Sequence, residues 1–197
     1  MVPVTCACLA AGRSSRMKGD HKLLKIIGNN SVISHVGAQL SELSLHELVV
    51  VTGGESEIIE ALLKGFPLRI LKNPDFAKGM HSSVRQAILN MDPESKALVI
   101  CLGDQPFDLK QRMIRLLDAG NITTETLRRS SVEGKPGHPV IIGRRYFDRI
   151  LAQPDGDYGC AYLFKEFSFE SVEQGASALW DLDTQEDFDR YAHLLNT

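Results

Sequence analysis

The stretch "CLAAGRSSRMKGDHKLLKIIG", residues 8–28, connects an apolar run to a helical pattern through small residues and cations. Residues 2–9 form a short run of apolar and β-branched side chains, which is typical of a strand. Residues 31–43 place their apolar side chains at helical spacing. The beginning of the chain therefore predicts a strand, a polar loop and a helix.

The same order of strand and helix repeats three more times before residue 119. Apolar runs at residues 48–54, 68–73 and 97–106 each lead into a segment with helical spacing. The helices are predicted around residues 58–63, 82–91 and 113–117. Continuous apolar strands joined by helices predict a mostly parallel central sheet flanked by helices. We therefore predict an α/β fold, with a single domain over residues 1–197.

The pattern is less regular after residue 119, and we interpret this part as an insertion into the same domain. Residues 132–143, "VEGKPGHPVIIG", predict a Gly/Pro loop that runs into a strand, and residues 146–153 predict a short helix. Residues 178–195 predict the end of a strand followed by a last helix. Thr184 and Asp187 are spaced as a capping box at the start of that helix.

Composition excludes several classes of protein. The chain is 43% hydrophobic and 24% charged, with a net charge of -3, which argues against a nucleic-acid binder held by bulk positive charge. Its start lacks the features of a signal peptide, and no apolar run approaches the ~18 residues that span a bilayer. These features predict a cytoplasmic protein with no nucleic-acid or membrane partner. The four cysteines show no C-x-x-C pairing and predict buried thiols.

Ligands of an open parallel sheet collect at the carboxyl ends of its strands. The loops expected there are residues 10–22, 52–54, 73–83 and 103–106, and all four are rich in glycine or polar residues. In the first loop, Ala10, Ala11 and Gly12 leave backbone N–H groups open to a ligand. The cations of the same loop are Arg13, Arg16, Lys18 and Lys22. This combination suits a polyphosphate, and the alternative is a solvated basic loop.

Two well-known phosphate-binding motifs do not match this loop. A P-loop needs Gly-Lys followed by Ser or Thr, but Gly19 is followed by Asp20 and His21. A dinucleotide-binding turn needs a second glycine where Ser14 stands. A different kind of phosphate site is therefore expected.

Five motifs together resemble one family. They are "LAAGRSSRM" with Lys22, "GMHSSV", "GDQP", "PGHPV" and "DLDTQEDF", at residues 9–17, 79–84, 103–106, 136–140 and 181–188. In this order they look like the molybdenum cofactor cytidylyltransferase family of nucleotidyltransferases, over nearly the whole chain. The resemblance implies a Rossmann-like nucleotidyltransferase fold that transfers CMP from CTP to the terminal phosphate of molybdopterin and releases pyrophosphate. Related sequences mature xanthine dehydrogenase-type enzymes, which implies a molybdoenzyme partner of that type.

The resemblance and the chemistry of nucleotidyl transfer point to the same side chains for binding the triphosphate and the metal ion. Attack of a phosphate on a nucleotide brings two anions together, so neutralisation of charge dominates catalysis. Arg16 and Lys22 match the family's pair for the triphosphate. Asp104 follows a buried strand and is expected to bind Mg²⁺, or Mn²⁺, with Asp183 as the second carboxylate. The predicted catalytic residues are therefore Arg16, Lys22 and Asp104.

Both carboxylates also have a structural alternative. Asp104 could cap the next helix, although Asp108 is the more natural cap, and Asp183 could be only a helix-flanking acid. Of Asp181 and Asp183, only one is expected to reach the metal.

The resemblance places the base against the backbone of residues 9–11 and against Gly79 and Ser83. The nucleotide-binding set that it implies is Leu9, Ala10, Ala11, Gly12, Arg13, Arg16, Lys22, Gly79, Ser83 and Asp104. Ser82 could instead only cap a helix. The methyl group of Ala11 favours a pyrimidine, and therefore CTP, by excluding a larger base.

The two histidines of these motifs have no expected role in proton transfer. "PGHPV" resembles the segment that faces the acceptor, which places His138 on the acceptor side. Because the attacking phosphate oxygen is already ionised, His81 and His138 are predicted to be contacts or structural residues.

Two other functions use the same residues. A guanylyl- or sugar-nucleotidyltransferase would have the same loops, although relatives that use GTP tend to read L-A-G-G where this chain has residues 9–12. A non-catalytic chaperone could deliver the cofactor to a dehydrogenase. Asp104, Lys22 and Asp183 argue against the chaperone, because binding alone needs no pair of metal ligands.

Overall fold

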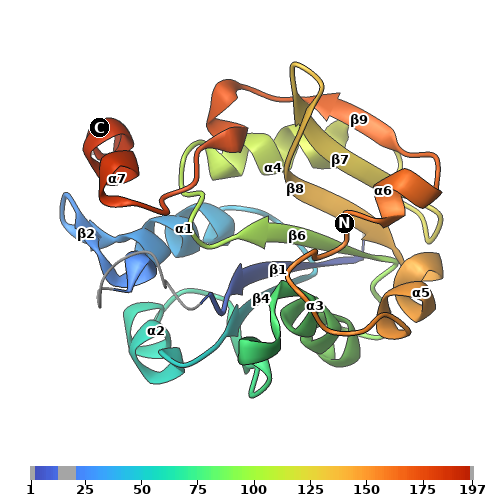
Figure 1. Ribbon diagram of the computed structural model, residues 1–197, viewed down its shortest axis with the longest axis horizontal. Helices are drawn as coiled ribbons and strands as arrows, with labels where there is room; N and C mark the ends of the chain where they lie inside the picture. The colour runs from blue at the N-terminus through green and yellow to red at the C-terminus, as the bar shows by residue number, and fades with distance from the viewer. Residues whose placement is uncertain (1–2, 13–20, 196–197) are drawn as a thin grey trace.

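A seven-stranded sheet forms the centre of the protein (Figure 1). The computed structural model describes residues 3–12 and 21–195. The strands lie in the order β5-β4-β1-β6-β8-β7-β9. Their bounds are β1 Val4–Ala10, β4 Glu47–Thr52, β5 Arg69–Lys72, β6 Ala97–Leu102, β7 Leu127–Val132, β8 Lys135–Gly143 and β9 Glu170–Glu173. The strands β5, β4, β1 and β6 are parallel, so their carboxyl ends meet at one edge of the sheet.

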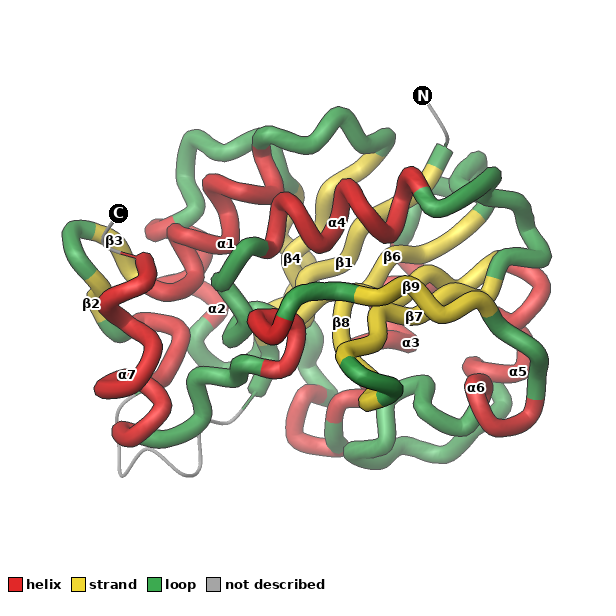
Figure 2. The backbone as a smooth tube through the Cα atoms, turned by 90° about the horizontal axis from the view of Figure 1, so that it is seen from above, coloured by secondary structure: helices red, strands yellow, loops and turns green. Residues whose placement is uncertain are grey.

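Helices cover both faces of the sheet, and Figures 1 and 2 show α1 and α4 on the face opposite α3. The helices are α1 Val32–Ser41, α2 Ser56–Leu62, α3 Met80–Asn90, α4 Leu109–Asp118, α5 Phe147–Leu151, α6 Leu163–Glu166 and α7 Gln185–Tyr191. Alternate side chains of β1 point to opposite faces. Cys6 and Cys8 pack into the core under α1 and α4, whereas Ala7 and Leu9 pack under α3. The predicted α/β architecture is therefore confirmed.

Short elements complete the two ends of the molecule. The hairpin of β2 (Ile26–Ile27) and β3 (Asn30–Ser31) lies with α7 at one end, and α5 and α6 lie at the other (Figure 2). The 3-10 helices are η1 Lys22–Leu24, η2 Phe76–Lys78, η3 Arg144–Tyr146, η4 Ala176–Leu179 and η5 Ala192–Leu195. Among the described residues, no helix has the length and apolarity to cross a membrane.

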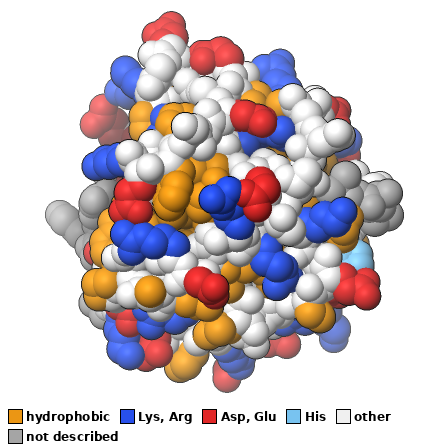
Figure 3. Space-filling view, turned by 90° about the vertical axis from the view of Figure 1, so that its right-hand side faces the viewer, with side chains coloured by type: hydrophobic (Ala, Val, Ile, Leu, Met, Phe, Trp, Pro, Cys, Tyr) orange, Lys and Arg blue, Asp and Glu red, His pale blue; other side chains and the backbone are white. Residues whose placement is uncertain are grey.

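Charges of both signs are interspersed on the side of the molecule that contains α5 and α6 (Figure 3). One ion pair at this end joins Arg149 of α5 to Glu166 of α6 at 2.8 Å. All four cysteines are buried thiols, as predicted, and Cys6 Sγ lies 3.9 Å from Cys101 Sγ.

The second half of the sheet differs from the sequence prediction. The expected Gly/Pro loop is already strand from Lys135, and β8 pairs antiparallel with both β6 and β7. The expected strand at residues 178–183 is wrong, because this segment is the end of η4 followed by irregular chain. The capping box is confirmed: Asp187 N donates to Thr184 Oγ1 at 3.2 Å, and Thr184 N donates to Asp187 Oδ2 at 2.8 Å.

The structure differs from both predicted helix caps: Asp108 has the N-cap position without the capping bond, and Ser82 is not an N-cap residue. Asp108 stands at the N-cap position of α4 with a left-handed φ of 50°, but its side chain makes no capping hydrogen bond. At α3 the N-cap is Gly79, and Ser82 lies inside the helix. The hydroxyl of Ser82 donates to the carbonyl oxygens of Gly79 at 2.8 Å and Asp75 at 2.9 Å, so it fastens the preceding turn instead of capping the helix.

Candidate active site

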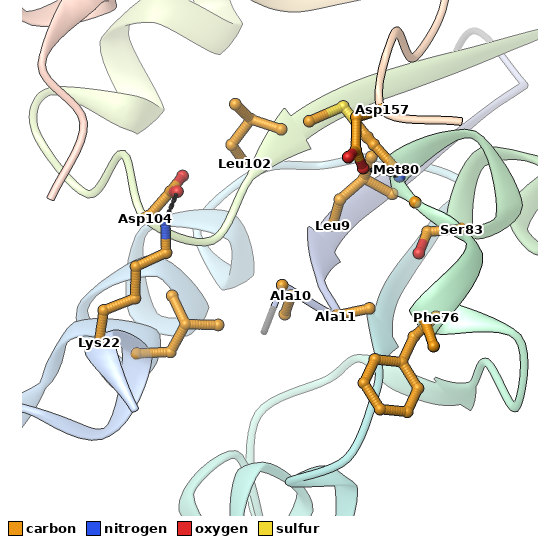
Figure 4. Close-up of a pocket in the computed structure, with 14 residues that line it drawn as sticks. Leu9, Ala10, Ala11, Lys22, Phe76, Met80, Ser83, Leu102, Asp104 and Asp157 are labelled. Carbon is orange, nitrogen blue, oxygen red and sulfur yellow. Dashed lines mark hydrogen bonds and ion pairs between the residues drawn. The ribbon is translucent and has the colours of Figure 1, made fainter. Parts of the chain in front are cut away.

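A pocket of about 320 Å³ opens at the carboxyl ends of β1 and β6 (Figure 4). It is lined by Leu9, Ala10, Ala11, Gly12, Lys22, Leu23, Phe76, Ala77, Gly79, Met80, Ser83, Leu102, Asp104 and Asp157. Every described residue of the predicted nucleotide-binding set is among them. Arg13 and Arg16, with Lys18 of the same loop, lie outside the described residues.

Lys22 joins two carboxylates at one end of this pocket. Its Nζ donates to Asp104 Oδ2 and, at 2.5 Å, to Asp183 Oδ1. The exposed fractions of the Lys22, Asp104 and Asp183 side chains are 13%, 18% and 29%, so water screens these charges only weakly. Burial alone would lower the pKa of Lys22, but the carboxylates of Asp104 and Asp183 outweigh it, and the pKa is raised.

Asp104 retains an unused oxygen. Its Oδ1 is buried and accepts no hydrogen bond from the part of the chain that the structure describes. An unsatisfied carboxylate oxygen is costly unless a ligand completes it, and hard divalent cations take carboxylate oxygens. Mg²⁺ is typically held by one or two carboxylates with phosphate oxygens and water. Asp104 and Asp183 fit this pattern, and residues 3–12 and 21–195 contain no larger group of metal-ligating side chains.

Backbone and amide hydrogen bonds bring the C-terminal segment to Asp104. Leu182 N donates to Asp104 O at 3.1 Å, and Gln105 Nε2 donates to Asp181 Oδ1 at 2.6 Å. Asp181 is therefore turned toward Gln105, and of this pair only Asp183 contacts Lys22. Burial raises the pKa of Asp181, and the charges of Asp104 and Asp183 add to that effect.

Arg112 of α4 holds the loop that carries Asp104 in place. This arginine is 2% exposed and donates to the carbonyl oxygens of Gln105 at 2.6 Å, Phe107 at 3.0 Å and His138 at 2.9 Å. The loop after β6 and the middle of β8 are thereby held on one buried cation. Neither the sequence spacing nor the composition of α4 indicated this role, because most of these contacts are with backbone oxygens and only one, to Gln105 Oε1 at 3.2 Å, is with a side chain.

The two histidines of the predicted motifs do not line the pocket. Burial lowers the pKa of His138 to about 4 because it outweighs the opposing charge of Asp104, and the Arg112 charge lowers the pKa further, so the ring is neutral at physiological pH. His81 is completely buried, and its ring nitrogens lie 3.0 Å from the carbonyl oxygens of Gly159 and Ile150. His81 is therefore a structural residue, which is one of the two roles that the sequence predicted for it.

Backbone conformation shapes the other end of the pocket. Gly79 has a φ of 105°, and a Cβ there would come within 2.5 Å of the carbonyl carbon of Gly156. Ser83 faces the pocket from α3, and its Oγ accepts from Asn73 Nδ2 at 3.0 Å. Sequence reasoning did not assign Phe76, Met80 or Asp157, which also line this end. For Asp157 the signal was its place between two glycines in "GDYG", residues 156–159.

Comparison with known proteins identifies related chains. A family model described as "MobA-like NTP transferase domain" matches residues 6–172. The molybdenum cofactor cytidylyltransferase of Escherichia coli K12 is 25% identical over 192 residues, which are 95% of each chain. The bifunctional protein GlmU of Sphingopyxis alaskensis is 34% identical over 117 residues, which cover 59% of this chain and only 26% of that longer protein.

Solved structures share the fold. Rv0371C from Mycobacterium tuberculosis H37Rv, crystallised in complex with manganese, superimposes with a TM-score of 0.82 at 22% identity. The superposition covers 97% of this chain and 98% of that one. The chain therefore shares the overall fold of this solved structure over nearly its whole length.

Proposed function

Because the chain belongs to the family of MobA-like NTP transferase domains, we propose that it transfers CMP from CTP to the phosphate of molybdopterin and releases pyrophosphate. The single observation that carries the reaction type is the contact of Lys22 with Asp104 and Asp183 at one end of the pocket. The acceptor is supported by the cytidylyltransferase of Escherichia coli, which matches this chain over 95% of both lengths.

In this proposal the chain's own residues bind, neutralise and align the nucleotide. Lys22 neutralises the triphosphate, together with Arg16 and Arg13 of the preceding loop, and residues 9–12 present backbone N–H groups to it. In the nucleotide complex, Lys22 donates to a phosphate oxygen beside or in place of one of its carboxylate partners. Gly79 and Ser83 border the base.

Asp104 and Asp183 are the proposed ligands of Mg²⁺ or Mn²⁺. When bound, such an ion supplies positive charge to the phosphate oxygens as negative charge shifts to the leaving pyrophosphate. The unused Oδ1 of Asp104 supports this assignment from within the chain. A manganese complex of a structural relative makes Mn²⁺ a suitable probe.

The acceptor phosphate needs no general base, because its second pKa is about 6 and it is largely ionised at neutral pH. His138, which is neutral there, is proposed to border the acceptor as an uncharged hydrogen-bonding group. A molybdoenzyme of the xanthine dehydrogenase type is the proposed recipient of the product.

Pyrophosphate release, measured with each of the four NTPs and purified molybdopterin in Mg²⁺ or Mn²⁺, tests the proposal. CTP is expected to exceed GTP by roughly tenfold to two-hundredfold in kcat/KM, because exclusion by a methyl-sized group has that range. Preference for GTP would overturn the assignment of CTP as the nucleotide donor. Release that requires a sugar phosphate would overturn the acceptor. Binding of molybdopterin without turnover of any NTP would identify a cofactor chaperone.

A further inference from the structure

The pocket has two chemically different ends (Figure 4). Lys22 and Asp104 lie at one end, whereas Asp157 lies near Met80 and Ser83 at the other. Leu9, Ala10 and Ala11 line the pocket between these ends. A nucleotide whose phosphates lie beside Lys22 therefore presents its base to the end that carries Asp157.

Hydrogen bonds fasten the loop of Asp157 to the start of α3. His81 N donates to Gly156 O at 2.9 Å, and Met80 N donates to Asp157 Oδ1 at 3.2 Å. Farther along the helix, Arg85 Nη2 donates to Gln153 O at 2.7 Å. The close approach of Gly79 to Gly156 leaves no room for a side chain between the two segments. The carboxylate of Asp157 is thereby fixed at the pocket wall although the residue is exposed.

One oxygen of this carboxylate remains available to a ligand. Oδ1 accepts the amide of Met80, and the structure records no hydrogen bond to Oδ2 from the described residues. A carboxylate only accepts hydrogen bonds. The exocyclic amino groups of cytosine, adenine and guanine are donors, whereas uracil carries a carbonyl oxygen where cytosine carries its amino group. A fixed carboxylate at the base end therefore favours an amino-bearing base and repels that oxygen of uracil.

We propose that Asp157 is a specificity-determining residue that binds the exocyclic amino group of the nucleotide base. The inference rests on the proposed function for the direction of the nucleotide and for the choice of cytosine. Asp157 then selects CTP against UTP by its charge, whereas Ala11 acts against purines by size. The neighbouring carboxylate of Asp155 has a different position, because it pairs with Arg85 at 3.2 Å and does not line the pocket.

Equilibrium binding of CTP, UTP and GTP to the full chain in Mg²⁺ tests Asp157 without any acceptor. In Asp157→Asn, the side-chain oxygen still accepts the Met80 amide, and the new NH₂ group donates to uracil instead of accepting from cytosine. The ratio of CTP to UTP affinity is expected to fall by roughly 10- to 100-fold, the range for a hydrogen bond to a charged group. Asp157→Ala should lose CTP affinity and gain less UTP affinity than Asp157→Asn, because alanine ends the repulsion of uracil but donates no hydrogen bond to it. Asp155→Asn is the control on the same loop and should keep the wild-type ratio.

The outcomes separate this inference from the proposed function. A wild type that prefers CTP, with the same ratio in both Asp157 variants or an equal loss in Asp155→Asn, overturns the role of Asp157 and leaves the proposed donor standing. A wild type that prefers GTP, with the GTP to UTP ratio lost in Asp157→Asn, supports the role of Asp157 and overturns the proposed donor. A wild type that binds UTP as tightly as CTP and GTP overturns the inference.

Discussion

At the scale of single residues, the ammonium group of Lys22 neutralises two carboxylates that would repel each other without it. A divalent cation and Lys22 Nζ therefore compete for Asp104 Oδ2 and Asp183 Oδ1. In Lys22→Gln, we expect Mn²⁺ to bind several-fold more tightly in the absence of nucleotide, and CTP to bind roughly tenfold more weakly. Electron paramagnetic resonance of Mn²⁺ and a CTP binding titration measure the two effects.

The matched control is Lys25→Gln, because Lys25 follows the same 3-10 helix but pairs with Gln185 and lies over the Phe188 ring. Unchanged Mn²⁺ affinity in Lys22→Gln would show that Lys22 does not compete with the ion. A large loss of stability with unaltered CTP binding would instead make Lys22 a structural residue.

Asp104 carries the second prediction at this scale. Asp104→Asn removes the negative charge beside the unused oxygen and is expected to lower turnover by about 100-fold or more, with the fold retained. Steady-state pyrophosphate release at saturating CTP measures the loss. Asp108→Asn is the control, since Asp108 has a left-handed φ of 50°, which asparagine also adopts, and makes no capping bond. Near-normal Mg²⁺-dependent turnover of a folded Asp104→Asn protein would refute the assignment.

His138 gives a pH dependence whose sign follows from its low pKa. The unfolded chain takes up a proton near pH 6.5, whereas the folded protein does so only near pH 4. Between these values the unfolded state binds more protons, so this group lowers the free energy of unfolding as the pH falls. His138→Gln should reduce the slope between pH 6.5 and pH 4 in urea titrations. Parallel curves for wild type and variant would contradict the shift, and His193→Gln controls for loss of an exposed histidine.

At the scale of elements, the capping box of α7 stabilises the helix and also orients Asp183. Asp187 Oδ2 accepts from Thr184 N and also from Asp183 N at 3.1 Å, so the first turn of α7 orients the residue that contacts Lys22. Thr184→Ala should cost about 1 kcal/mol, and lower Tm by about 2–4 °C. It should also weaken Mn²⁺ binding.

Differential scanning calorimetry and the Mn²⁺ titration measure both effects of Thr184→Ala. Glu186→Gln is the control, because Glu186 lies in the same turn with a side chain that is 80% exposed and is not part of the capping box. A lower Tm with unchanged Mn²⁺ affinity would show that the capping box stabilises α7 but does not orient Asp183 for metal binding.

The sequence predicted the strands that show a continuous run of apolar side chains. Strands β1, β4 and β6 are apolar runs buried on both faces, and their ends agree with the predicted ends within a few residues. Strands β7 and β9 were missed because "LRRSSV" and "ESVE" are polar. They become strands through pairing with β8 and with each other, a tertiary effect that local pattern does not record.

The candidate site likewise contains residues that the sequence predicted and residues that it did not. Lys22 and Asp104 were predictable because small and charged residues directly follow apolar strands, and the structure brings both into the pocket. The two glycines of "GDYG" mark the loop of Asp157 but do not show where it lies, because the loop reaches the pocket through hydrogen bonds to the carbonyl oxygens of Gly156, Gln153 and Gly159. Every residue offers a carbonyl oxygen, so such contacts leave no pattern in the sequence.

At the scale of the whole molecule, one sheet connects parts of the chain that are far apart in the sequence. The strand order places β8 beside β6 and β9 at the edge beyond β7, so the second half of the chain extends the sheet begun by the first. The pocket draws side chains from Leu9 to Asp157, and Asp183 reaches Lys22 from near the C-terminus. A ligand in this pocket therefore contacts segments from the whole length of the chain.

We accordingly predict a single thermal unfolding transition that shifts as a whole when nucleotide and metal bind. A ligand at 100 times its Kd stabilises the folded state by about 2.7 kcal/mol, which corresponds to roughly 5–10 °C in Tm for a chain of this size. CTP with Mg²⁺ should produce this shift, and Asp104→Asn should lose the part that requires Mg²⁺. Calorimetric scans with CTP alone, Mg²⁺ alone and both together separate the contributions. If the residues from both halves form one site, both halves must gain stability together, so two transitions of which only one responds to ligand would contradict a single cooperative domain.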